Sequence, residues 1–494
     1  MSGLTSFFNQ YRFEFSFAAI FISFYYFPDD FKLFVFVNFL LILLLITLYK
    51  NFFLSTYSVF FVSLFFLEPG KYYSMAVIRP GLIWAEPFWS EGYNMSYGLI
   101  VSDILAILLI GYSFSYILKK LVFKRRITDI RELSFLPNRL VIYCWFMFVA
   151  FGLFSAVNVT FEPIFSTFVL FQYAKIIVVF VSTLFLLSTK QNWSFFNSLL
   201  SSLLLANIFK TIIDAIFIFS PLSSIISFGA ANSSEWPGIF RIPGTFLHAN
   251  QFAFFIIILV LLSINAQRGI LKNKFFKIIT LVLLILTQSR TGWLIAATLS
   301  FFWFLTNRSY LNFSKKVING RFILVGSSVI TILIPLVIKR SLAIFSSFNG
   351  GSGSIRLEML SQGFELYRIS PLWGFGAENN IKSIFENVPN SYIAYFPAPI
   401  HTAFVQFLLE FGLMGTAFLI LPFLILLKSV EIFQTDQSYR INRFVNYSLL
   451  FSVFCYYVFQ PHGGRFEVPL LGLIAGYIAA DLSLSNWKKN KKNA

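Results

Sequence analysis

Long apolar runs follow one another along the chain, and most are long enough for a membrane-spanning helix. In such helices every backbone N–H and C=O is hydrogen-bonded within its own segment, as the interior of a bilayer requires. The chain is 57% hydrophobic and 12% charged, which excludes a soluble protein of 494 residues. The runs are 14–27, 33–49, 52–67, 98–118, 139–157, 163–188, 194–219, 250–266, 278–306, 322–338, 401–427, 444–460 and 467–485. We predict an all-α, multi-pass membrane protein in which residues 1–494 form a single helical domain.

The net charge of +17 lies mostly in short loops between these runs. The basic segments are 119–139, 267–277, 307–321, 428–443 and 488–492. Short basic loops are typical of the cytoplasmic side of a membrane, where they meet anionic lipid headgroups. The charge therefore predicts the orientation of the chain, with both termini in the cytoplasm, and does not indicate a nucleic-acid partner.

Residues 278–306 do not fit a single pass, because basic loops flank both of their ends. One helix would place those loops on opposite sides of the membrane. Two short helices, 278–289 and 291–306, resolve the conflict if the chain turns at Ser289–Gly292. Each arm is shorter than the hydrocarbon core of about 30 Å, so the turn is expected within the outer half of the membrane. This hairpin brings the total to about fourteen membrane segments and places His248, His401 and His462 outside.

Three connections on the outer side are long, namely 68–97, 220–249 and 339–400. The first carries Trp and Pro residues that are typical of an interfacial loop. The large extracytoplasmic loop 339–400 contains an apolar-periodic stretch at 355–367, which predicts a helix on the membrane surface. A proline-bounded segment then leads into the helix expected to start at His401.

Arginines and histidines gather on this outer side, against the usual loop bias. Charges at membrane depth cost several kcal/mol, so a function must hold them there. Arginine grips phosphate through a planar two-pronged contact, and histidine readily exchanges a proton near neutral pH. The candidates are Arg241, His248, Arg290, Arg356, Arg368, His401, His462 and Arg465. Together they predict chemistry on a phosphorylated, membrane-borne substrate.

Four motifs carry a resemblance to a known group. They are R-x-P-G-T-F-x-H-A-N from Arg241, S-R-T-G-W from Ser289, S-P-L-W-G-F-G from Ser370 and H-T-A-F-V-Q-F-L-L-E-F-G-L-M-G from His401. Over residues 230–425 the chain resembles the O-antigen ligase and O-antigen polymerase superfamily, although Thr402 stands where many relatives have Asn. The resemblance implies a GT-C-type helical fold that acts on undecaprenyl-diphosphate-linked sugars outside the inner membrane. It also implies that Arg241, Arg290 and His401 line the active site.

Elementary chemistry assigns roles that agree with this resemblance. Glycan transfer from a polyprenyl diphosphate builds charge on the departing oxygens, and fixed guanidinium groups would stabilise that charge. A neutral histidine can take the proton of the attacking hydroxyl. The dipole at a helix start disfavours imidazolium and should keep His401 neutral. We expect no cofactor and no metal. Arg356, Arg368, His248, His462 and Arg465 are expected to contact the donor or the acceptor.

Each candidate also has a structural alternative. Arg290 could cap the carbonyls of the helix that ends beside it, or extend toward the headgroups. Arg241 could be an ordinary loop residue, and His401 could merely sit where a helix enters the interface. Cys144 and Cys455 lie within apolar runs and indicate neither a disulfide nor a metal site.

Other functions stay open at this point. A flippase for an anionic lipid-linked substrate would need charges accessible from both sides, whereas these candidates face one way. A metal-dependent oligosaccharyltransferase would need acidic metal ligands on the outer side. Asp29 and Asp30 are the one adjacent acidic pair expected there.

Polymerase and ligase differ in the acceptor, which is a growing glycan for a polymerase and lipid A-core or another acceptor for a ligase. The long outer loop favours a polymerase. The expected partners are the lipid-linked donor, a glycan or lipid acceptor, membrane lipids and, for a polymerase, a chain-length regulator.

Overall fold

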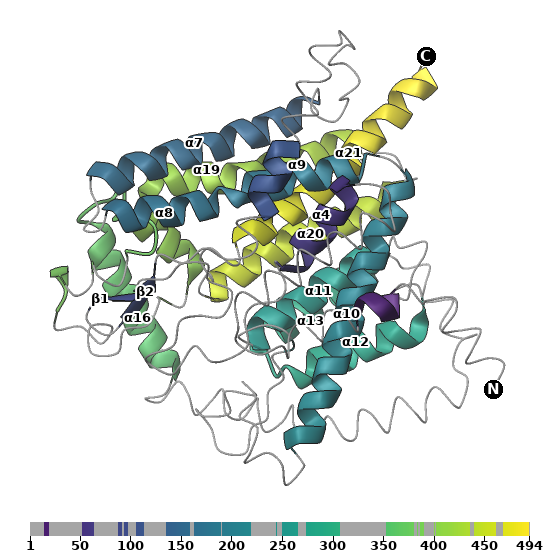
Figure 1. The fold of residues 1–494 in the computed structure, drawn as a ribbon, viewed down its shortest axis with the longest axis horizontal. Helices are drawn as coiled ribbons and strands as arrows, with labels where there is room; N and C mark the ends of the chain where they lie inside the picture. Colours follow the sequence, from purple (N-terminus) through teal and green to yellow (C-terminus); the bar gives the residue numbers. More distant parts are fainter. Residues whose placement is uncertain are drawn as a thin grey trace.

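The computed structural model describes residues 14–18, 52–63, 87–90, 93–96, 105–112, 135–158, 163–188, 190–218, 244, 249–264, 273–306, 352–379, 383, 386–389, 400, 402–434, 439–460 and 468–493. Most of these residues are helical (Figure 1). The main helices are α4 (Phe52–Ser63), α7 (Leu136–Asn158), α8 (Pro163–Tyr173), α9 (Lys175–Leu186), α10 (Lys190–Ile218), α11 (Ala249–Ile264), α12 (Lys274–Leu286), α13 (Arg290–Thr306), α16 (Ser352–Tyr367), α19 (Ala403–Phe433), α20 (Arg440–Phe459) and α21 (Val468–Asn493). The predicted helical class is therefore confirmed for this part of the chain.

Five stretches of helix in the described residues are long and apolar enough to cross a membrane. They are 136–158, 163–186, 192–213, 403–433 and 468–487, and each coincides with a predicted apolar run. The chain is thus a multi-pass membrane protein. The predicted runs 33–49 and 322–338 lie outside the described residues, so the total of about fourteen segments stays a prediction.

One small element departs from the all-helical expectation. Strands β1 (Pro87–Ser90) and β2 (Tyr93–Ser96) pair antiparallel, with Ser90 opposite Tyr93. The sequence analysis treated residues 68–97 as an interfacial loop. The pairing is understandable, since aromatic residues favour strands and the two intervening residues include Gly92, which suits a tight turn.

Two pairs of long helices make the frame of the bundle, α7 along α19 and α9 along α21. The indole Nε1 of Trp145 on α7 donates to the Leu419 carbonyl of α19 at 3.3 Å. On α21, Gly472 and Gly476 are four residues apart and face α9. A Cβ at Gly472 would overlap the Ile176 carbonyl, so the close approach of these helices depends on the small residue.

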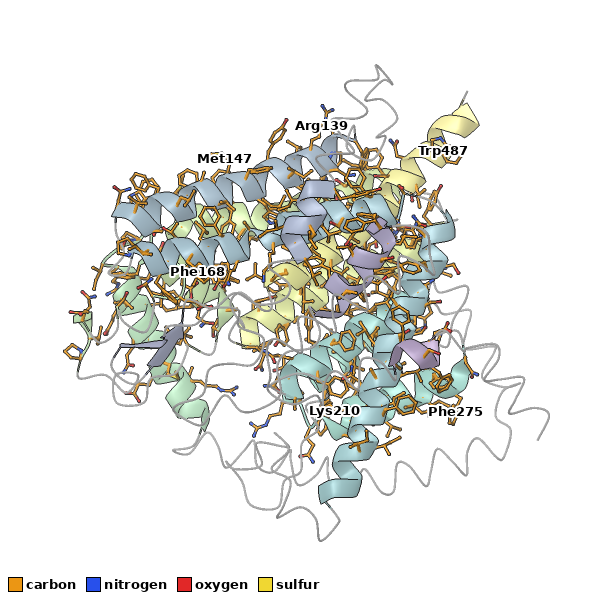
Figure 2. All side chains as sticks on the ribbon, viewed as in Figure 1. Arg139, Met147, Phe168, Lys210, Phe275 and Trp487 are labelled. Carbon is orange, nitrogen blue, oxygen red and sulfur yellow. The ribbon has the colours of Figure 1, made fainter. Side chains whose placement is uncertain are left out.

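The inner faces of the helices form one large hydrophobic core, whereas some outer faces stay apolar and exposed. Trp145, Phe180 and Phe411 belong to the core, and side chains fill the space between the helices (Figure 2). Met147 lies on the outer side of α7 and is exposed (Figure 2). Phe146 and Phe154 on the same helix are exposed as well. Large apolar side chains on an outer face are what contact with lipid requires.

A buried polar cluster joins the end of α19 to α20 and α21. The carboxylate of Asp481 accepts hydrogen bonds from Gln434 Nε2 (2.7 Å), Asn442 Nδ2 (2.6 Å) and Asn446 Nδ2 (2.9 Å). Gln434 is also the C-cap of α19. A buried carboxylate is tolerated when several donors satisfy it, so this cluster is a structural joint between the three helices.

Candidate active site

The turn between α12 and α13 is built by short polar side chains. Gln288 adopts a left-handed conformation, with φ of 50°, just after the last turn of α12. Ser289 then caps α13, because its Oγ accepts a hydrogen bond from Gly292 N–H at 3.1 Å. Two helices therefore replace the single apolar run, as predicted. The turn itself is shorter than expected, since residues 290–292 already form the first turn of α13.

Arg290 is the first residue of α13. Its side chain is half-buried, and its Nε atom is buried. The N-terminus of a helix carries partial positive charge and free backbone N–H groups, which attract anions. A guanidinium at this position adds a full charge and a planar donor set, so the start of α13 is suited to a phosphate.

The end of α12 has donors other than Arg290. The Leu284 carbonyl accepts from Thr287 Oγ1 at 2.7 Å and from the Trp293 indole at 3.2 Å. The Leu283 and Ile285 carbonyls accept backbone N–H groups of the turn. The Leu283, Leu284 and Ile285 carbonyls at the end of α12 thus have donors other than the arginine. The indole also holds the first turn of α13 against α12.

One described residue lies close to Arg241 in the sequence, namely Gly244. Gly244, three residues beyond Arg241, is buried and packs against Asn207 of α10 and Phe252 of α11. The helix that follows, α11, begins at Ala249, directly after His248. Arg241 and His248 themselves lie outside the described residues.

The helix expected to start at His401 starts two residues later. Thr402 is the N-cap of α19, with an extended backbone, and Ala403 is the first helical residue. His401 lies outside the described residues, so its proposed role as a base stays a prediction. In the sequence, His401 is the residue directly before this cap.

A glycine kink divides α19. Gly412 has φ of 64°, and the loop that contains Gly374, with φ of 73°, lies directly against it. A Cβ on either glycine would overlap the backbone of the other segment. The loop and the kink share backbone hydrogen bonds: Phe375 N–H to the Leu409 carbonyl (2.6 Å), Gly376 N–H to the Glu410 carbonyl (2.8 Å) and Leu413 N–H to the Pro371 carbonyl (2.8 Å). The two motifs S-P-L-W-G-F-G and L-L-E-F-G-L-M-G therefore form one unit.

Glu410 beside the kink is a buried carboxylate within a membrane-spanning helix. The hydroxyl of Tyr173, at the end of α8, donates to Glu410 Oε2 at 3.4 Å. Ionisable residues at such depth are expensive and are retained for a reason. The sequence analysis did not single out Glu410, although a lone acidic residue in an apolar run was an available signal.

Gln460 connects four helices at one point. It caps the end of α20, where its backbone N–H donates to the Tyr456 carbonyl at 2.9 Å. Its own carbonyl accepts from Ala403 N–H, at the start of α19, at 2.8 Å. Its side-chain Oε1 accepts from Asn250 Nδ2 of α11, and its Nε2 donates to Thr291 Oγ1 of α13, both at 2.7 Å. All of these helix ends therefore meet at a single buried residue.

This junction collects the segments that carry the predicted site residues. Each of the four connected residues lies within two sequence positions of a predicted site residue. Asn250 is near His248, Thr291 is next to Arg290, Ala403 is near His401, and Gln460 is near His462. His462 and Arg465 lie outside the described residues. Sequence reasoning missed Gln460 and its partners, although a polar residue at the end of an apolar run, just before Pro-His, was the signal.

Arg356 and Arg368 lie on a different part of the molecule. Both are exposed, Arg356 on α16 and Arg368 directly after it. Arg368 lies twelve positions beyond Arg356, which corresponds to about 18 Å along a helix. Whereas α16 packs on α19, α13 packs on α11 and α20 (Figure 1). The predicted contact of these two arginines with the donor or the acceptor stays a prediction.

The predicted surface helix is confirmed as a helix, but part of its apolar face packs inward. Met359 and Leu366 are buried, and Gly363 packs against Ile400 and Val405 at the start of α19. Leu357 and Phe364 of the same helix are exposed. Contact of this exposed stripe with the membrane surface stays a prediction.

The described residues contain no group of three or more His, Cys, Asp or Glu side chains that could hold a metal ion. Their polar groups near the junction are instead amides, hydroxyls and the Arg290 guanidinium. These groups can orient helix ends and bind an anion.

Comparison with known protein families gives one match, to the O-antigen ligase family over residues 275–420. The match includes Arg290, Arg356, Arg368 and His401, and it ends within α19. Arg241, His248 and Gln460 lie outside it. No curated protein matches the chain. Residues 275–420 therefore match an O-antigen ligase domain.

Proposed function

We propose that the protein polymerises undecaprenyl-diphosphate-linked oligosaccharide repeat units into a surface polysaccharide, at the outer face of the inner membrane. The observation that supports this most is the junction at Gln460. It draws together the start of α13, which carries Arg290, and the start of α19, which follows His401. A cation for a leaving diphosphate and a base for an incoming hydroxyl are the two groups that such a transfer needs.

In the proposed reaction, an acceptor hydroxyl oxygen attacks C1 of the donor sugar. His401 takes the proton of that hydroxyl, and the bond between C1 and the diphosphate oxygen breaks. The electron pair of this bond leaves with the undecaprenyl diphosphate, whose growing negative charge Arg290 and Arg241 stabilise. The reaction balances without a metal or a redox partner.

The half-buried position of Arg290 determines how much its guanidinium can raise the rate of transfer. Charge-assisted hydrogen bonds contribute roughly 1.5–3 kcal/mol each, and more where water is excluded. Because every 1.4 kcal/mol is about tenfold in rate, one bond made only in the transition state is worth roughly 10- to 100-fold. The helix start adds backbone N–H groups that need no reorganisation.

A ligase is the second candidate, and the family match favours it by its description. In that case the acceptor would be lipid A-core or a similar lipid, and the chemistry at C1 would be the same. Purified protein incubated with lipid-linked repeat units alone should give a ladder of products if it is a polymerase. A single product that appears only with added lipid A-core would instead assign it as a ligase.

The residue roles can be tested with two variants. We expect Arg290→Lys to keep normal membrane insertion but lose most transfer, because a lysine lacks the planar grip on phosphate. We expect His401→Ala to abolish product formation while the protein still retains the lipid-linked donor. Retained donor and formed product are measured on the same purified samples.

Arg139→Lys is the matched control, since Arg139 is an exposed arginine near the start of α7 and outside the proposed site (Figure 2). It should transfer like the wild type. If His401→Ala forms product at a near wild-type rate, the base assignment is wrong and His248 becomes the next candidate.

A further inference from the structure

We propose that Gln460 is a positioning residue, which holds the starts of α11, α13 and α19 in the register that transfer requires. The inference rests on the proposed function for its catalytic part. It goes beyond that function because it assigns a role to a residue that lies outside the family match and that no motif indicated.

The geometry leaves Gln460 little freedom. Its backbone N–H and C=O are both hydrogen-bonded, as are both ends of its side-chain amide. The side chain is 5% exposed, so water cannot easily replace its partners. The backbone contacts would survive a substitution, whereas the contacts to Asn250 and Thr291 depend on the amide.

The amide contacts reach residues next to the chemistry. Thr291 follows Arg290 in the first turn of α13, and its hydroxyl receives the amide N–H. Asn250 lies in the first turn of α11, two residues beyond His248. Without the amide these two helix starts lose their shared partner. Since a misplacement of about 1 Å can cost about 100-fold in rate, the loss should appear in turnover.

A second buried glutamine provides a matched control. Gln434 is the C-cap of α19, is fully buried, and uses both ends of its amide, to Asp481 and Asn446. It lies at the other end of α19 from the junction. Gln434→Ala therefore removes an equivalent capping amide without touching the helix starts.

The kinetic experiment compares Gln460→Ala with Gln434→Ala in the purified full-length protein. We expect Gln460→Ala to lower kcat by about 100-fold with a small change in KM, and Gln434→Ala to lower thermal stability but not kcat. Thr291→Val should act like Gln460→Ala, and Thr291→Ser should retain more activity. The double variant Gln460→Ala, Thr291→Val should be no worse than Gln460→Ala alone, because Gln460→Ala already removes the contact to Thr291.

A distance measurement tests the positioning without any need for activity. Cysteines replace Leu294 near the start of α13 and Leu424 in the second half of α19, both about half exposed, in a background that lacks Cys144 and Cys455. Spin labels on this pair report the position of α13 relative to α19. We expect Gln460→Ala to broaden or shift the distance distribution, and Gln434→Ala to leave it as in the parent.

The outcomes separate the two proposals. If the parent protein forms no product from polyprenyl-diphosphate donors, the proposed function fails and the distance distribution alone decides the role of Gln460. An unchanged distribution in Gln460→Ala overturns the positioning role. The positioning role is also overturned if Gln460→Ala changes the distance distribution but lowers kcat no more than Gln434→Ala does.

Discussion

At the scale of single residues, Ser289 decides where α13 begins and hence where Arg290 lies. Its hydroxyl accepts the Gly292 N–H, and it is fully buried. Ser289→Ala should lower the free energy of unfolding by about 1 kcal/mol, the usual value of such a cap. It should also reduce transfer, since the first turn of α13 would fray beside Arg290. Thermal unfolding and product formation are the two measurements.

Ser300→Ala is the control in the same helix, because its hydroxyl bonds only to the Ala296 carbonyl one turn earlier and is exposed. It should change neither stability nor transfer noticeably. If Ser289→Ala and Ser300→Ala behave alike, the cap does not determine the position of Arg290.

At the scale of elements, the kink of α19 and the loop at residues 370–379 behave as one unit. Gly412→Ala places a side chain at a positive φ with an extended ψ, a backbone conformation essentially restricted to glycine, which alone costs about 1–3 kcal/mol. The new Cβ would also overlap the backbone of Leu372 and Trp373. We expect loss of the folded protein or a large fall in the thermal midpoint, read by the yield of monodisperse protein in detergent.

Gly111→Ala provides the comparison, because a Cβ at Gly111 meets no atom within 4 Å and its helix gains from alanine. It should express at the parent level. A Gly412→Ala protein that is as stable as Gly111→Ala would show that the loop can separate from the kink.

At the scale of the whole molecule, α19 has to cross the membrane. Glu365 is exposed on α16, which packs near the start of α19, and Lys428 is exposed near the other end. The path from Ala403 to Lys428 is about 38 Å, longer than the hydrocarbon core of about 30 Å. In cells, a cysteine at 365 should react with a membrane-impermeant maleimide, whereas a cysteine at 428 should react only after permeabilisation.

Both cysteines are introduced into a protein that lacks Cys144 and Cys455, and a protein with no cysteine gives the background signal. The reverse labelling pattern would invert the orientation and place Arg290 on the cytoplasmic side. The proposed active site and its lipid-linked donor would then have to be abandoned together.

The sequence by itself determined the helical membrane class and the break near Arg290. Both follow from local chemistry. A run of apolar residues spans a bilayer only as a helix with its own hydrogen bonds, and Thr287, Gln288 and Ser289 supply the turn and the cap from neighbouring positions. The motifs of the ligase domain could likewise be found in the sequence, since each is a continuous stretch.

The tertiary structure alone decided which helix ends meet. Gln460 and Thr291 are 169 residues apart, and Gln460 and Asn250 are 210 apart, so no local pattern links them. The same holds for Gly374 and Gly412, which are required together where two backbones touch. Such pairs depend on long-range packing. A buried amide or a buried backbone group is stable only where another segment of the chain supplies its hydrogen-bond partner.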